Sequence, residues 1–304
     1  MSTAKSENDL QLRTDTMKKW NKKQILYYAL LGVFLLVFLF SAGYLLKYMI
    51  ESRQQNNLYE DLSNQITGST VERPTGGYVP PTSKPEIDNT AEPSQEATES
   101  TTEPSAPISN NDLGILNEYY PIYQQNTDMV GWIRIEDTVI NYPVMQTPNR
   151  KDYYLKHNFE KKWSAWGCIY AREACDINAP SDNITLYGHH MKDGSMFSGL
   201  DRYWYRENWE AQPFIYFDTL YEYRTYQIFA MFITSAVPGE GFAYHVFSDA
   251  ETAEEFDVFI AHAKELSMYD TGITPVFGDQ ILTLSTCYGT DEDARYVVMA
   301  VRVS

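Results

Sequence analysis

Alternating hydrophobic and polar positions run from residue 113 to residue 304 and predict a mainly β fold. Apolar side chains recur at every second position in eight short runs, which is the period of half-buried strands. The expected strands are residues 130–135, 139–144, 167–171, 183–187, 214–218, 223–235, 280–287 and 294–303. This pattern favours a closed or nearly closed eight-stranded β-barrel decorated with helices.

Two stretches follow the helical period instead. One covers residues 195 to about 209, and the other covers residues 249–267. The second has acidic residues early and Lys264 late, which suits the helix dipole. A shorter helix with a proline interruption is expected within residues 113–126.

A continuous apolar run near the N-terminus predicts a membrane anchor. Residues 24–46 carry no charge and can cross about 30 Å of hydrocarbon as a helix. Lysines cluster just before the run, so the positive-inside rule places residues 1–23 in the cytoplasm. We predict a single-pass anchor at residues 24–50. A cleaved signal peptide is the alternative, but the run is long for one and no clear A-x-A site follows.

Residues 51–112 are expected to link the anchor to an extracellular catalytic domain at residues 113–304. The part from about residue 64 to 110 is rich in Pro, Ser, Thr and Glu and nearly free of large apolar residues. Such a segment cannot offset its ordering entropy, which predicts a disordered spacer. It could be a stalk or a linker of no selected length, and residues 51–63 could continue the membrane helix briefly.

Net charge and cysteine content exclude some kinds of partner and of cross-link. The net charge of −17 argues against a nucleic-acid partner, because phosphate binding needs clustered Lys and Arg. Three cysteines cannot form a disulfide framework and leave at least one free thiol. Cys168 has the setting of a small buried residue. A Cys168–Cys175 bridge is conceivable outside a cell, but proximity in sequence does not show contact, and we expect none.

The remaining cysteine, Cys287, ends the run "ILTLSTC". It shares a strand face with Thr283 and Ser285, while the leucines of the run fall on the other face. A buried structural cysteine would be expected on the leucine face, whereas a reagent could reach this one. A thiol needs a partner to act as a nucleophile at neutral pH.

Two of the five histidines could be that partner. His189 and His190 follow a predicted strand and a glycine, in "NITLYGHHMKDG", where side chains can face a site. A metal site or plain surface would be the alternative use of such a pair. Metal binding is disfavoured because no companion ligands stand at regular spacing, and no metal or organic cofactor is implied.

Arg295 follows Cys287 after the seven residues "YGTDEDA". If the flanking runs are antiparallel neighbours, Arg295 lies within side-chain reach of Cys287. It could be a solvated cap, paired with the acidic residues of the loop, or a donor for a developing oxyanion. Spacing alone favours neither.

Taken together, "YGH" at a strand end, "TLSTC", and an arginine after a short loop resemble the sortases, the cysteine transpeptidases of Gram-positive cell surfaces. The resemblance covers the chain from residue 113 onward plus the membrane anchor. The order His, Cys, Arg argues against papain-like enzymes, in which Cys precedes His. The stretches "DMVGWIRIEDTVINYPVMQ", "DYYLKHNF" and "LYGHHMKDGSMF" are most similar to class B.

The resemblance implies roles for individual residues. His189 matches the catalytic histidine, Cys287 the nucleophile and Arg295 the active-site arginine, while His190 occupies a more variable position. Ser285 matches a residue lining the substrate groove. Leu155 resembles a groove-lining apolar position, with ordinary core packing as the alternative, and Asn149 resembles a neighbouring position of the groove.

The activity implied by the resemblance is cleavage of a C-terminal sorting signal on secreted proteins through a cysteine thioester. The acyl group would pass to an amine of the peptidoglycan cross-bridge or its lipid-linked precursor. A pilus-assembling sortase using a pilin lysine is one alternative. Another is an L,D-transpeptidase, although those enzymes usually have glycine where this chain has Thr286. A binding domain with a degenerate site is the third.

Overall fold

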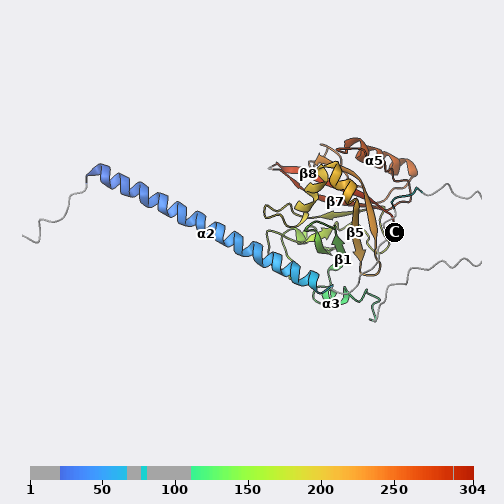
Figure 1. Cartoon of the computed structure of the whole chain (residues 1–304), viewed down its shortest axis with the longest axis horizontal. Coiled ribbons are helices and arrows are strands. Elements are labelled where there is room, and N and C mark those ends of the chain that lie inside the picture. Colours follow the sequence, from blue (N-terminus) through green and yellow to red (C-terminus); the bar gives the residue numbers. More distant parts are fainter. Residues whose placement is uncertain (1–20, 67–76, 81–110, 290) are drawn as a thin grey trace, which may run out of the picture. The chain divides into compact units, whose positions relative to one another are not determined.

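The computed structural model describes residues 21–66, 77–80, 111–289 and 291–304 (Figure 1). The chain divides into two compact units, residues 1–54 and 55–304. Helix α2 (Lys22–Asn64) begins in the first unit and ends in the second. Among the described residues it is the one helix long and apolar enough, by length and composition, to cross a membrane.

Helix α2 continues to Asn64, in agreement with the alternative that residues 51–63 extend the membrane helix. Two apolar side chains three residues apart, Tyr59 and Leu62, are buried in the second unit. The Tyr59 hydroxyl donates to the Gly167 carbonyl at 2.7 Å. Of the rest of the predicted linker, residues 67–76 and 81–110 lie outside the described residues.

The second unit is built on a closed barrel of eight strands, as the alternation predicted (Figure 1). Its strands are β1 (Met129–Arg134), β2 (Asn141–Met145), β3 (Ile169–Ala171), β4 (Asn183–Tyr187), β5 (Phe214–Thr219), β6 (Thr225–Ser235), β7 (Ile281–Tyr288) and β8 (Asp291–Arg302). Around the barrel they follow the order β1-β2-β3-β4-β7-β8-β6-β5, with β4 and β7 parallel and β7 and β8 antiparallel. Closure leaves no open sheet edge.

Strand β7 has two different faces. Leu282 and Leu284 are fully buried on one face. On the other face, Ile281 belongs to an aromatic-rich cluster with residues of β6, β8 and helix α5 (Ala253–Leu266). The side chain of Thr252 caps α5 by accepting from the Glu255 amide. Because Cys287 shares the face of Ile281, it lies on the side of β7 that α5 partly covers.

The helices differ in detail from their sequence patterns. The stretch expected at residues 195–209 is a 3-10 helix, η2 (Phe197–Trp204), followed by α4 (Arg206–Ala211), because Tyr205 has extended backbone angles. The short helix within residues 113–126 is α3 (Tyr120–Tyr123). A single turn of 3-10 helix, η1 (Tyr153–Leu155), follows β2.

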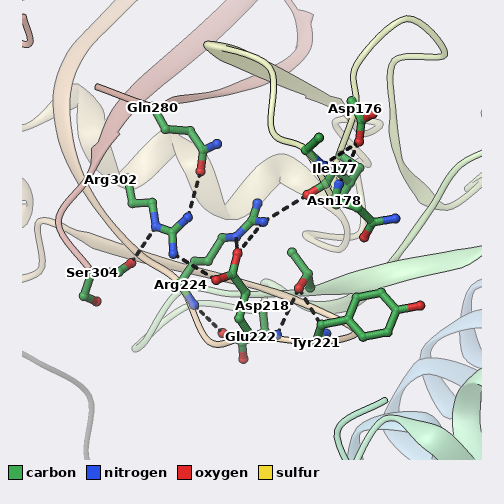
Figure 2. Close-up of polar contacts among 12 residues, drawn as sticks. Asp176, Ile177, Asn178, Asp218, Tyr221, Glu222, Arg224, Gln280, Arg302 and Ser304 are labelled. Carbon is green, nitrogen blue, oxygen red and sulfur yellow. Dashed lines mark hydrogen bonds and ion pairs between the residues drawn. The ribbon is translucent and has the colours of Figure 1, made fainter. Parts of the chain in front are cut away.

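A buried arginine network holds the strand ends that lie away from Cys287 (Figure 2). Arg224, just before β6, donates to Glu222 and to the Ile177 carbonyl at 2.9 Å. Arg302, at the end of β8, also reaches Glu222 and donates to Gln280. These contacts fix one end of the β6–β8 sheet, while Arg295 lies at its other end, paired with Cys287 of β7.

Candidate active site

Cys287 lies one residue before the end of β7 and is exposed. The β7–β8 register pairs it directly with Arg295. Directly paired residues of antiparallel strands project to the same face, with Cβ atoms about 5 Å apart. The pairing therefore places the guanidinium of Arg295 on the same face as the thiol.

The seven residues between Cys287 and Arg295 are mostly strand rather than loop. Tyr288 still pairs with Asp291, and an irregularity in register after Cys287 absorbs the extra residues of β8. The hairpin turns at Gly289, whose φ of 63° suits glycine. Arg295 is half-buried, and its Nη1 donates to the Ala294 carbonyl at 3.0 Å.

The parallel pair β4 and β7 brings the segment that carries His189 to the same end of the barrel. Tyr187 is the register partner of Ser285, and the Gly188 amide donates to the Ser285 carbonyl at 3.1 Å. His189 follows the end of β4 by two residues, and Cys287 follows Ser285 by two residues on β7.

Gly188 is needed for the close packing in front of His189. A Cβ at this position would lie 2.5 Å from Ile169 Cδ1 and 2.6 Å from Phe197 Cδ2. Any side chain would therefore displace the strand end that carries the histidine.

The imidazole of His189 has a fixed orientation. Its Nε2 lies 2.8 Å from the carbonyl oxygen of Leu155, at the end of η1. A carbonyl can only accept, so Nε2 carries a hydrogen and donates it. Nδ1 is then the ring nitrogen left for proton transfer.

Burial lowers the pKa of His189 below its usual value, with a smaller contribution from Lys156, while the bond to the Leu155 carbonyl opposes this shift. When the pKa of a histidine is lower in the folded state, the unfolded chain binds a proton at a pH where the folded chain does not. Proton binding then favours the unfolded state. The penalty is absent well above pH 6.5 and grows as the pH falls below it.

We therefore expect the free energy of unfolding to fall more in the wild-type chain than in His189→Gln when the pH is lowered from about 7.5 to about 5. The two losses should differ by at most about 2 kcal/mol. Urea unfolding of both chains at the two pH values measures this difference. An equal loss of stability in both would contradict the depressed pKa.

Ser285 shares the face of Cys287, as predicted, but it does not line an open surface. Its side chain is 1% exposed, and its hydroxyl shares a 2.7 Å hydrogen bond with the Tyr244 hydroxyl. Tyr244 covers it because the connection between β6 and β7 folds back over the outer face of the barrel. Direct contact of Ser285 with a substrate stays a prediction that requires Tyr244 to move.

The sequence predicts two further residues of the substrate groove, Leu155 and Asn149. Leu155 is half-buried and contributes the main-chain oxygen that orients His189. The sequence gives no sign of this use, because every residue has a carbonyl. Asn149 is exposed in the turn after β2. Its role in substrate binding stays a prediction.

His190 has contacts different from those of His189. It is exposed, and its Nε2 lies 2.8 Å from Asp201 Oδ2 of η2. Together with residues of η2 and the β1–β2 turn it lines an open cavity of about 540 Å³. The two adjacent histidines therefore differ in burial and partner, which their sequence did not show.

The other two cysteines are buried free thiols. Cys168 contacts the Tyr59 hydroxyl, and burial raises its pKa to about 12. Cys175 donates to the Asn183 carbonyl, and burial raises its pKa as well. Both thiols stay protonated at neutral pH, which leaves Cys287 as the accessible sulfur among the three.

Comparison with known proteins places this arrangement in a family. The family model of the sortase domain matches residues 133–303. Sortase B of Listeria monocytogenes is 33% identical over 180 residues, which cover 59% of this chain and 70% of the relative. Sortase B of Staphylococcus aureus is 29% identical over 179 residues, covering 59% and 71%.

Comparison with solved structures also gives matches to sortase B. The structure of a Staphylococcus aureus sortase B–substrate complex matches with a TM-score of 0.57 and 29% identity, covering 62% of this chain and 86% of that one. Sortase B from Bacillus anthracis in complex with AAEK2 matches with a TM-score of 0.58 and 33% identity, covering 66% and 88%. This chain therefore belongs to the sortase family of cysteine transpeptidases, and within it to class B.

Proposed function

We propose that this protein cleaves a C-terminal sorting signal on secreted proteins and joins the new carboxyl end to a cell-wall amine. The observation that carries this proposal is the strand register, which sets Cys287 opposite Arg295 and brings the end of β4, two residues before His189, beside Ser285 of β7. A nucleophile, an acid–base group and a cation on one accessible strand end suffice for acyl transfer.

In the first half-reaction the Cys287 sulfur attacks the carbonyl carbon of the scissile peptide bond. Negative charge develops on the carbonyl oxygen, where Arg295 and a backbone N–H stabilise it. His189 takes up the proton that the Cys287 thiol loses and passes it to the leaving amine, the C–N bond breaks, and the acyl group remains on sulfur as a thioester.

In the second half-reaction an amine of the peptidoglycan cross-bridge, or of its lipid-linked precursor, attacks the thioester. His189 takes a proton from the attacking nitrogen, and collapse of the tetrahedral intermediate forms the new amide and restores the thiol. The fixed bond from Nε2 to Leu155 assigns both proton transfers to Nδ1.

The location follows from the N-terminal segment. We place residues 1–23 in the cytoplasm, residues 24–50 of α2 in the membrane and the barrel outside the cell. The lysines that precede the apolar run support this orientation.

Replacing Arg295 with lysine tests the role of the guanidinium. A lysine ammonium keeps the charge but loses the planar fork of donors, so we expect kcat/KM for peptide cleavage to fall about 100-fold. Arg302→Lys makes the same change on the same strand at its remote end and should leave kcat/KM nearly unchanged. Near-normal turnover of Arg295→Lys would reduce Arg295 to a surface cap.

The proposed reaction is tested with the full-length chain in detergent, a library of sorting-signal peptides and an added amine. Mass spectrometry should detect a new amide between the upstream fragment and the amine. Thiol alkylation should abolish this product. A product that persists after Cys287 is alkylated would exclude the proposed chemistry.

A further inference from the structure

The C-terminal turns of α2 belong to the same compact unit as the catalytic residues. They carry Tyr59, whose side chain is 4% exposed. Its hydroxyl donates to the Gly167 carbonyl at 2.7 Å and lies 3.3 Å from the Cys168 sulfur. A hydroxyl has one hydrogen and a carbonyl can only accept, so the Cys168 thiol donates to the Tyr59 oxygen. Both the donor and the acceptor capacity of this hydroxyl are therefore used.

One chain of contacts leads from Tyr59 to the imidazole of His189. Gly167 lies against the main chain of η1, where an added Cβ would stand 2.6 Å from the Leu155 carbonyl oxygen. The peptide unit whose carbonyl accepts from Tyr59 also donates its N–H to the Tyr154 carbonyl, at 2.9 Å. A trans peptide directs these two groups to opposite sides, so this one is held between α2 and η1. The Leu155 carbonyl in turn accepts from His189 Nε2.

A second chain of contacts leads to the main chain of His189. The ring of Tyr59 packs edge-on against that of Tyr142 on β2, with ring centroids 5.2 Å apart. The Tyr142 hydroxyl accepts from the Met196 amide at 3.0 Å. The next amide, that of Phe197, donates to the His189 carbonyl at 2.9 Å. The same tyrosine therefore supports both the ring and the backbone of the histidine.

The acceptor that orients His189 needs such support. It is the carbonyl at the end of η1 (Tyr153–Leu155), a single turn of 3-10 helix with few hydrogen bonds of its own. Proton transfer requires the imidazole to lie within hydrogen-bond reach of the reacting nitrogen. An error of about 1 Å in such a placement can cost about 100-fold in rate.

We propose that Tyr59 is a positioning residue for His189, and that the end of α2 thereby completes the active site of the barrel. This inference rests on the proposed function, in which His189 is the acid–base group. Tyr59 acts through Gly167 and Tyr142 and takes no part in the proton transfers. The helix that carries the candidate membrane span is then also part of the catalytic unit.

Tyr59→Phe, in the full-length chain in detergent, removes the hydroxyl and keeps the ring. We expect kcat for peptide cleavage to fall about tenfold and KM to change less than about twofold. The reason is that the variant loosens the acid–base group and leaves the bound substrate in place.

Tyr119→Phe is the matched control. It removes the hydroxyl of another buried tyrosine, which donates to Asp218 of β5 at 2.6 Å. Because that bond is to a carboxylate, the control should lose at least as much stability in urea unfolding as Tyr59→Phe. It should nevertheless keep the kcat of the wild-type chain.

Nitrogen NMR of the chain labelled at its histidines follows the imidazole directly, with His189→Gln used to assign the signals. At neutral pH the wild-type His189 should be the tautomer with its hydrogen on Nε2, as the bond to Leu155 requires. Tyr59→Phe should move the signals toward a mixture of the two neutral tautomers, whereas Tyr119→Phe should not. A loss of global stability alone does not change the tautomer of the folded state.

The outcomes separate the inference from the proposed function. Unchanged kcat and an unchanged tautomer in Tyr59→Phe would overturn the inference and leave the proposed function standing. Equal losses of kcat in Tyr59→Phe and Tyr119→Phe would assign the effect to stability and overturn the inference as well. A mixed tautomer with unchanged kcat would support the positioning by Tyr59 and overturn the acid–base role of His189.

Discussion

Cys287→Ala should lower the rate of peptide cleavage by at least about 10⁴-fold, because it removes the nucleophile on which both half-reactions depend. Folding should survive the change. The Cys287 side chain is exposed at a strand end, and exposed substitutions usually alter the free energy of unfolding by less than about 0.5 kcal/mol. Steady-state cleavage of an accepted peptide and urea unfolding measure the two effects.

Cys175→Ala is the matched control. Its thiol is buried and bonded to the main chain of Asn183, away from solvent. This variant should keep its cleavage rate and lose some stability, the reverse of the Cys287→Ala result. Substantial cleavage by Cys287→Ala, or equal damage in both variants, would contradict the assignment of the nucleophile.

His189→Ala should reduce kcat by about 10³-fold, since the leaving amine then departs without a proton donor. His190→Ala should change kcat less than about threefold, because His190 is exposed and its contact is with Asp201 on η2. The pair is a controlled comparison of one residue type at adjacent positions.

Single-turnover measurements of acylation and amine transfer show which step each histidine serves. We expect both steps to be slow in His189→Ala. A larger defect in His190→Ala would mean that the other imidazole is the acid–base group.

Much of this architecture could be predicted from the chain alone. The period of two along β7 located the strand and put Cys287 on the face away from Leu282 and Leu284. The turn-forming stretch after Cys287 suggested an antiparallel neighbour, which the pairing with Arg295 confirms. Local pattern is sufficient here, because strand period and hairpin connection are local properties.

The details that depend on distant segments could not be predicted. Tyr244 covers Ser285 from a connection 41 residues away in sequence, and Leu155 orients His189 across 34 residues. No periodicity encodes such contacts, and the second uses only a main-chain oxygen. After residue 50 polar residues outnumber the few, including Tyr59, that pack against the barrel, so the pattern there leaves both a linker and a continued helix open.

The central claim is that the acyl group is carried on Cys287, and trapping the intermediate tests it most directly. The full-length chain is mixed with an accepted peptide in the absence of amine, quenched in acid and examined by intact and peptide-level mass spectrometry. The account predicts an added mass equal to the upstream fragment, located on the peptide that contains Cys287 and released by hydroxylamine. Amide formation without any such adduct, or an adduct on another residue, would contradict it.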